Sequence, residues 1–256
     1  MAGVALVTGG ARRVGRAIVQ RLAAEGYDIA IHCRSASSDG EMLAEDIRRG
    51  GRTTVLLQGD LMDETVPAAL LEETTAALGA PGLLVNNASV FEHDDALSAP
   101  EEIWRRHMQV NLRAPFLLSQ AFARALSGDA SGCIVNIIDQ RVWRPNPDFM
   151  SYTLSKSALW TLTQTLAQAL APRIRVNAVG PGPVLQSRHQ DVTAFARECA
   201  NVPLGHGVRP DDVADAVFYL AEATAVTGQM IAVDGGQHLA WQTPDVLSGQ
   251  GDGHGR

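Results

Sequence analysis

The stretch Val4-Ala-Leu-Val-Thr-Gly-Gly-Ala-Arg-Arg-Val-Gly15 decides the fold of this 256-residue chain. An apolar run of strand length passes into a glycine-containing turn, and a helical pattern over 16–22 follows. Glycine at such a turn lets the backbone approach a pyrophosphate, which then sits at the helix N-terminus. The glycines also suit a plain turn, but their place after the first strand favours a dinucleotide site. We expect the cofactor against Gly9, Arg12, Arg13, Val14 and Gly15.

Working outward, short apolar runs alternate with longer helical patterns along the whole chain. This alternation predicts an α/β fold, a Rossmann-type doubly wound, seven-stranded parallel sheet with helices on both faces. We expect one dinucleotide-binding and catalytic domain over 1–256, with a loose, polar C-terminal tail at about 242–256. The expected strands are 4–7, 28–32, 53–57, 82–85, 133–138, 174–178 and 230–233, and the expected helices are 13–25, 39–50, 64–78, 100–126, 150–171, 186–200 and 210–222.

Composition narrows the class of protein. The chain is 46% hydrophobic and carries a formal net charge of −7, which argues against a nucleic-acid or acidic-membrane partner. The three cysteines have no metal-ligand spacing, no apolar run reaches the ~18 residues of a membrane span, and no metal site is expected. Strand-like sequence begins almost at once, which leaves no room for a signal peptide. We expect a cytoplasmic protein with reduced thiols.

The end of the second expected strand indicates which dinucleotide binds. Many NAD sites place an acidic residue there, whereas this chain has Arg34 and Ser35. A guanidinium and a hydroxyl suit a 2′-phosphate, so NADP(H) is favoured; the alternative is a solvated loop arginine. Asp60 and Leu61, after the third strand, are expected beside the adenine, although Asp60 could instead cap a helix.

The spacing Asp139…Tyr152-Thr-Leu-Ser-Lys156 predicts a hydride-transfer site. A tyrosine and a lysine four residues apart on a helix point the same way. The Lys156 ammonium should then favour the ionised phenol of Tyr152 and lower its pKa from the reference value of ~10. Asp139 follows a buried strand, although it could instead cap a turn or a helix.

Together, Thr8-Gly9…Gly15, Asn86-Asn-Ala88, Asn111, Tyr152-x-x-x-Lys156 and Pro181-Gly182 resemble the short-chain dehydrogenase/reductase family, in order over nearly the whole chain. The resemblance implies that Tyr152 is the acid/base, that Lys156 holds the nicotinamide ribose, and that Asn111 supports a proton-relay water. It also implies a homo-oligomer, a tetramer or a dimer. The implied cofactor contacts are Thr8, Asn87, Ala88, Ser89, Tyr152, Lys156, Pro181 and Gly182.

Two departures from the general family pattern, Arg13 for Gly and Asp139 for Ser, are shared by pteridine reductases, as is the stretch Asn87-Ala-Ser89-Val-Phe91. The resemblance to that subgroup implies that Phe91 stacks on a pterin, that Arg13 lies near the pterin and the cofactor phosphates, and that Asp139 works with Tyr152. A flat heteroaromatic substrate suits an aromatic wall, although Phe91 could be a packed loop residue. The implied substrate contacts are Arg13, Ser89, Phe91, Asp139 and Tyr152.

These observations predict an NADPH-dependent reductase of a C=N bond in a pterin or dihydropterin, with dihydrofolate among the candidates, because C=N reduction needs a proton at nitrogen. The first alternative is a short-chain reductase of a carbonyl or alcohol substrate, such as a keto-sugar, ketoacid or quinone. A non-catalytic NADP-binding regulator is a third interpretation, against which the intact Tyr152, Lys156 and Asn111 argue. Five histidines without ligand spacing are expected at the surface or in loops: His93, His107, His189, His206 and His238.

Overall fold

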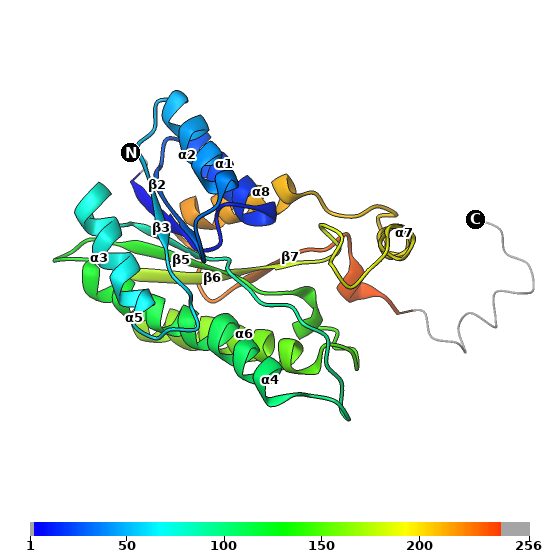
Figure 1. The fold of residues 1–256 in the computed structure, drawn as a ribbon. Coiled ribbons are helices and arrows are strands. Elements are labelled where there is room, and N and C mark those ends of the chain that lie inside the picture. The colour runs from blue at the N-terminus through cyan, green and yellow to red at the C-terminus, as the bar shows by residue number, and fades with distance from the viewer. Residues whose placement is uncertain (1–2, 242–256) are drawn as a thin grey trace, which may run out of the picture.

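The computed structural model describes residues 3–241 and places the strands in one parallel sheet (Figure 1). The strand order is β3-β2-β1-β4-β5-β6-β7, and every neighbouring pair is parallel. The expected seven-stranded, doubly wound sheet is therefore confirmed. The bounds are β1 Val4–Val7, β2 Asp28–Cys33, β3 Thr54–Gln58, β4 Leu83–Asn86, β5 Gly132–Ile137, β6 Ile174–Pro181 and β7 Met230–Val233.

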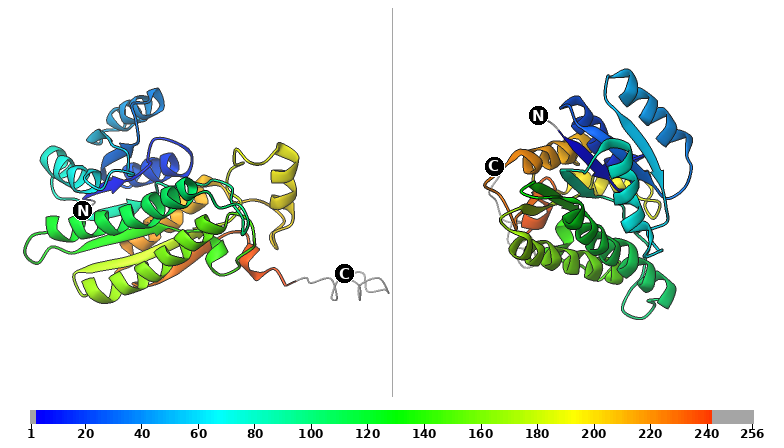
Figure 2. Two further views of the ribbon diagram at one scale, coloured as in Figure 1. Left: turned by 60° about the horizontal axis from the view of Figure 1, so that its bottom comes forward. Right: turned by 90° about the vertical axis from the view of Figure 1, so that its left-hand side faces the viewer.

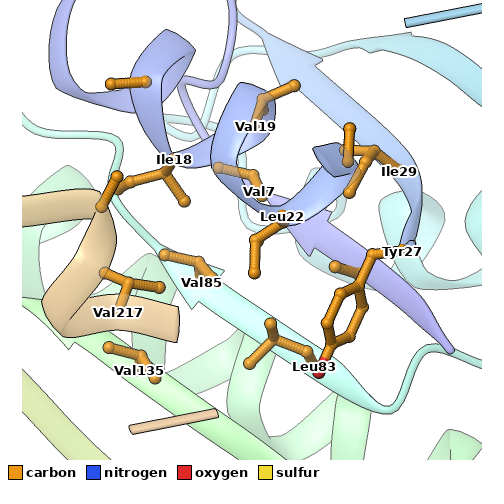
Figure 3. Packing of buried hydrophobic residues seen from close by; sticks show 14 of the residues in the cluster. Val7, Ile18, Val19, Leu22, Tyr27, Ile29, Leu83, Val85, Val135 and Val217 are labelled. Atoms are coloured by element: carbon orange, nitrogen blue, oxygen red, sulfur yellow. The ribbon is translucent and has the colours of Figure 1, made fainter. Parts of the chain in front are cut away.

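Helices cover both faces of the sheet, as Figures 1 and 2 show. One face is covered by α1 (Arg13–Ala24), α2 (Ser38–Arg49) and α8 (Pro210–Glu222). The core between α1, α8 and the sheet is built from aliphatic side chains such as Ile18, Leu22 and Val217 (Figure 3). The other face is covered by α3 (Val66–Leu78), α5 (Ala114–Ala125) and α6 (Met150–Leu170), with α4 (Glu101–Met108) packed on α6.

Two of the expected helices differ in detail. The stretch expected as one helix over 100–126 contains a π-helical turn, Gln109–Arg113, between α4 and α5. The helix expected over 186–200 begins only at Val192 (α7, Val192–Ala200), because the Asp191 side chain accepts a hydrogen bond from the backbone N–H of Ala194 and caps the helix there. The expectation for the tail at 242–256 lies outside the described residues.

The strand order reverses between β1 and β4, so the connections that leave these two strands run to opposite faces of the sheet. In open α/β sheets, such a reversal opens a crevice at the carboxyl ends of the strands. Residues following β1, β4, β5 and β6 are thereby brought to one edge. Among residues 3–241, none of the helices combines the length and the apolar character needed to cross a bilayer.

Candidate active site

A cavity of about 670 Å³ lies at this edge of the sheet. It is lined from the glycine turn at one end to Asp139, Tyr152 and Lys156 at the other. Thr8, Ser35 and Asn111 are the site candidates that do not line it. The candidates that it brings together are Gly9, Arg12, Arg13, Val14, Gly15, Arg34, Asp60, Leu61, Asn87, Ala88, Ser89, Phe91, Asp139, Tyr152, Lys156, Pro181 and Gly182.

In the glycine turn, the backbone at Gly15 approaches the backbone at Gly9 closely. A Cβ atom at Gly15 would lie 2.2 Å from the Gly9 carbonyl oxygen and 2.6 Å from Asn87 Nδ2, so only glycine fits there. The Thr8 hydroxyl accepts hydrogen bonds from the backbone N–H groups of Asn87 and Ala88, both at 3.0 Å. Thr8 therefore joins the end of β1 to the end of β4 and fixes the floor of the crevice.

Arg13 stands where the wider family places glycine, and its backbone shows why glycine suits the position. Its φ is +53°, in the left-handed region, which costs a non-glycine residue roughly 1–2 kcal/mol. Its guanidinium donates to the carbonyl oxygens of Leu185 and Gln186 at 3.1–3.2 Å. Arg13 thus joins the glycine turn to the chain that follows β6. The neighbouring Arg12 pairs with Asp39 at 2.6 Å.

The end of β2 carries one buried and one exposed basic side chain. His32 accepts from the Gly9 N–H through Nδ1 at 3.3 Å and donates through Nε2 to the Gly59 carbonyl at 2.9 Å. Burial lowers the His32 pKa, so this link is made by a neutral ring. Arg34 is exposed and has no ion-pair partner among the residues that the structure describes. Asp60 accepts from the N–H of Met62 at 3.0 Å.

At the other end of the cavity, Tyr152 and Asp139 are joined directly. The Tyr152 hydroxyl donates to Asp139 Oδ2 at 3.0 Å. The Lys156 ammonium is buried and donates to the Ile137 carbonyl at 2.9 Å, and it lies 5.6 Å from the centroid of the Tyr152 ring. Asp139 Oδ1 accepts from the N–H of Arg141 at 2.9 Å. The three side chains that the sequence singled out therefore converge at one place.

The electrostatics of this trio correct one expectation. Burial and the Asp139 carboxylate raise the Tyr152 pKa well above its ordinary value, so the prediction that Lys156 lowers it is wrong for this arrangement. Burial also raises the Asp139 pKa. The Lys156 pKa is lowered by burial to about 8, although Asp139 favours its charged form. Burial thus favours the neutral forms of both Tyr152 and Asp139 relative to the same side chains in water.

Asn111 lies at the centre of the π-helical turn, fully buried. Its oxygen accepts from the Val90 N–H at 2.8 Å and the Ser89 hydroxyl at 3.1 Å. Its amide nitrogen donates to the Val90 carbonyl at 3.0 Å and to the Ser155 hydroxyl at 3.1 Å. The side chain thus fixes the segment after β4 against α6. Its support of a proton relay remains a prediction.

Phe91 lies at the cavity wall, but it is not alone there. Its ring stacks on Phe149 with centroids 4.1 Å apart and planes inclined by 10°. It meets the Tyr152 ring edge-on at 4.7 Å, and the Arg141 guanidinium lies over both phenylalanines. One face of Phe91 is therefore covered by Phe149, which sequence reasoning missed. The only available signal was an aromatic residue three positions before Tyr152.

The expectation that His107 lies at the surface or in a loop is wrong. It belongs to α4, is fully buried, and its ring lies 5.9 Å from that of Tyr152. Its neighbours Asp94 and Ser151 are also fully buried. No spacing in the sequence marks these three residues as a group.

Comparison with known proteins places this geometry among reductases. A family model described as enoyl-(acyl carrier protein) reductase matches residues 9–238. The chain is 30% identical over 240 residues to the 3-oxoacyl-[acyl-carrier-protein] reductase FabG of Staphylococcus aureus, covering 92% of this chain and 98% of that protein.

Two solved structures are similar over nearly their whole length. FolM alternative dihydrofolate reductase 1 from Brucella canis, complexed with NADP, has a TM-score of 0.92 and 47% sequence identity, covering 95% of this chain and 97% of that one. A protein from Serratia marcescens BCRC 10948 described as a short-chain dehydrogenase/reductase has a TM-score of 0.87 and 32% identity, covering 92% of this chain and 98% of that one.

Proposed function

This chain belongs to the short-chain dehydrogenase/reductase family and is an oxidoreductase, and from that premise we propose that it uses NADPH to reduce a C=N bond of a pterin or dihydropterin, dihydrofolate included. The similarity to a FolM alternative dihydrofolate reductase solved with NADP supports both the cofactor and the substrate class. The observation that carries the substrate class is the hydrogen bond from Tyr152 to Asp139.

The residues present fit a dinucleotide phosphate. Gly15 lets the start of α1 pack against the Gly9 carbonyl oxygen, which a Cβ would meet at 2.2 Å, and the N-terminus of this helix would bind the pyrophosphate. Arg34 lines the cavity and would meet a 2′-phosphate, and Ser35 follows it in the chain. Asp60 and Leu61 would flank the adenine, and Asn87, Ala88, Pro181 and Gly182 would line the path to the nicotinamide. When bound, NADPH supplies the hydride.

Asp139 distinguishes between C=N and C=O substrates. A carbonyl develops negative charge on oxygen during reduction, and a site for it wants a donor there. The Asp139 carboxylate accepts hydrogen bonds and repels a developing alkoxide. A C=N nitrogen instead takes up a proton as carbon receives hydride, and a nearby carboxylate stabilises positive charge on that nitrogen. The charge at position 139 thus favours C=N.

The proton then follows a short path. Tyr152 transfers its hydroxyl proton to the substrate nitrogen, and the Asp139 carboxylate, whose Oδ2 accepts the Tyr152 hydrogen bond at 3.0 Å, then takes up a proton from solvent and passes it to the Tyr152 oxygen. Because burial raises the Asp139 pKa, this carboxylate takes up a proton at a higher pH than a solvated aspartate does. Lys156 fixes the nicotinamide ribose, and Phe91 and Ser89 border the pterin, with Arg13 closing the far side through its contacts at Leu185.

A carbonyl reductase is the second candidate, because relatives such as 3-oxoacyl-[acyl-carrier-protein] reductase act, by name, on a keto group. The same NADPH site and the same Tyr152 and Lys156 serve that reaction. Carbonyl reduction leaves Asp139 unexplained, because the charge of Asp139 opposes the alkoxide that develops on the substrate. A non-catalytic regulator has no use for Asp139 bonded to Tyr152, with Tyr152 and Lys156 both buried.

We also infer a cytoplasmic homo-oligomer, a tetramer or a dimer. A groove of about 610 Å³ runs along α4 and α5, lined by Trp104, Met108, Leu112, Phe116 and Leu162 among others. Trp104 is 41% exposed on this face. A second copy of the chain would cover such an apolar surface by closed symmetry.

The deciding experiment incubates the full chain with NADPH and a panel of dihydrobiopterin, dihydrofolate, a 3-oxoacyl thioester and simple diketones, and follows NADPH absorbance. We expect turnover with the dihydropterins to exceed that with every carbonyl compound. Tyr152→Phe is the matched control, because it removes only the hydroxyl and should abolish turnover with all of them. Preference for the thioester or a diketone would overturn the pterin assignment and leave the carbonyl reductase.

A further inference from the structure

We infer that Asp94, Ser151 and His107 form a buried hydrogen-bonded array that positions Tyr152 and the aromatic wall beside it for proton transfer. The three side chains are 0% exposed and come from three segments: the chain after β4, the start of α6, and α4. The inference rests on the proposal that Tyr152 is the proton donor. It extends that proposal to positioning residues, which do not touch the reacting atoms.

Asp94 caps α6 from a distance. The helix starts at Met150 after Phe149, which has no side-chain cap of its own. Both carboxylate oxygens of Asp94 accept from the Ser151 N–H at 3.2 Å, and Oδ2 also accepts from the Ser151 hydroxyl. The Asp94 carbonyl accepts from the Phe149 N–H at 2.9 Å. An anion at a helix N-terminus is favoured by the exposed N–H groups there, so Asp94 sets where α6 begins.

His107 completes the array, and the hydrogen bonds fix its tautomer. The Glu92 backbone N–H donates to His107 Nε2 at 3.1 Å, so Nε2 carries no proton. The proton of the neutral ring is then on Nδ1, which donates to the Ser151 hydroxyl oxygen at 2.6 Å. The hydroxyl's own proton goes to Asp94. Each hydrogen bond in the array therefore has one direction, and burial lowers the His107 pKa in keeping with a neutral ring.

The array positions both the backbone and the ring of Tyr152. Ser151 precedes Tyr152 directly, and the His107 ring packs against the Tyr152 ring. Through Glu92 the array also holds the segment that carries Phe91, whose ring meets Tyr152 edge-on at 4.7 Å. Through the Asp94 carbonyl it holds Phe149, whose φ of +58° lies in the left-handed region that a phenylalanine rarely adopts. The hydroxyl that donates the proton is thereby placed between fixed neighbours.

Ser151→Ala tests the inference, with Thr165→Ala as its matched control. Thr165 is an exposed hydroxyl residue on the same helix that bonds only to carbonyls of α6. With the substrate that the wild-type protein turns over fastest, Ser151→Ala should lower kcat about tenfold or more, because misplacing a reacting group by ~1 Å costs up to about 10²-fold. NADPH affinity should stay within about twofold of the wild type, since Thr8 holds the cofactor turn independently.

A second measurement does not depend on whether that variant folds. Nitrogen-15 NMR of the wild-type protein should show His107 as the neutral Nδ1–H tautomer. Asp94→Asn keeps the shape of the side chain, but either orientation of its amide sets NH₂ against the Ser151 N–H or hydroxyl. It should lower kcat and mix the His107 tautomers.

Two results would overturn the inference. The first is that Asp94→Asn and Ser151→Ala have the same kcat and KM as Thr165→Ala, within about twofold, and lose only thermal stability. The other is wild-type His107 found charged or protonated at Nε2 at neutral pH. The proposed function fails separately, in the wild-type substrate panel, so the two failures are distinguishable.

Discussion

Replacing Asp139 by Asn should separate pterin reduction from ketone reduction. The change keeps the size of the side chain, and an Asn oxygen still accepts from the Arg141 N–H that Asp139 Oδ1 now holds at 2.9 Å. It removes the carboxylate whose Oδ2 lies 3.0 Å from the Tyr152 hydroxyl oxygen, and with it the negative charge and the ability to take up and pass on a proton. Loss of a positioned acid or base typically costs 10²- to 10⁴-fold. We expect dihydropterin turnover to fall by about 10²-fold, about 2.7 kcal/mol of activation free energy.

The direction in which turnover changes with pH follows from the Asp139 pKa. The Asp139 pKa is raised by burial, so wild-type turnover should be highest below that raised pKa and should fall as pH rises through it. The Asn variant should lack this limb. Asp139 also favours the charged form of Lys156, whose pKa is about 8. Without that support the Lys156 pKa should drop further, and any loss of activity caused by Lys156 deprotonation should begin at lower pH.

The assay is steady-state NADPH oxidation across a pH series, with NADPH binding measured separately by fluorescence. Binding should be unchanged, because the role proposed for Asp139 is toward the substrate and not toward NADPH. Asp139→Ser supplies the residue of the wider family, and it should leave turnover of a simple diketone unchanged or improved because the repulsive charge is gone. If both variants reduce dihydropterin as fast as the wild type, the role assigned to Asp139 is wrong.

Other changes probe the cofactor site, the buried lysine and the assembly. Arg34→Ala should weaken NADPH by roughly 1.5–3 kcal/mol, the range of a charge-assisted hydrogen bond, and leave NADH nearly untouched; equal weakening in a binding titration would make Arg34 structural. Gly15→Ala should abolish NADPH binding, because its Cβ would lie 2.2 Å from the Gly9 carbonyl oxygen; unaltered NADPH affinity would refute the role of the glycine turn in binding the pyrophosphate. Lys156→Met should abolish turnover. It should also raise the free energy of unfolding at pH 7 by up to about 3 kcal/mol, because lowering the Lys156 pKa from 10.5 to about 8 reflects the free-energy cost of burying the charged ammonium. That gain should shrink as pH rises from 8 to 10.5, and a destabilised variant in denaturant unfolding would contradict it. Trp104→Glu should reduce the mass measured by sedimentation at micromolar concentration, whereas a wild-type mass of 27.3 kDa would contradict assembly itself.

The parts of the fold that the sequence predicted correctly are those with local signals. The run from Val4 to Gly15 contains a strand, a glycine-containing turn, and the start of a helix in which position 15 admits only glycine, and each follows from residues next to one another. The spacing of Tyr152 and Lys156 places both on one side of a helix for the same reason. Asp139 was found because it follows a strand whose carboxyl end must reach the crevice.

The missed features depend on contacts between distant segments. Lys156 is near Tyr152 in sequence, but its ammonium donates to the Ile137 carbonyl, while burial of the phenol and its hydrogen bond to Asp139 reverse the expected pKa shift. Arg13 reaches carbonyls more than 170 positions further along the chain. His107 lies in a helix with polar neighbours, and nothing in the sequence of that helix indicates that the ring is buried and bonded to Ser151.

The reversed pKa shift on Tyr152 leaves the choice of substrate to Asp139. A phenol whose pKa is raised by burial and by a neighbouring carboxylate is a weaker acid, and this shift by itself favours neither a C=N nor a C=O acceptor. The difference lies in the sign of the charge that develops on the substrate. The Asp139 carboxylate repels a developing alkoxide, whereas it stabilises a nitrogen that takes up a proton and becomes positively charged. The proposed preference for C=N therefore rests on the charge at position 139, which is why the Asp139→Asn and Asp139→Ser variants decide it.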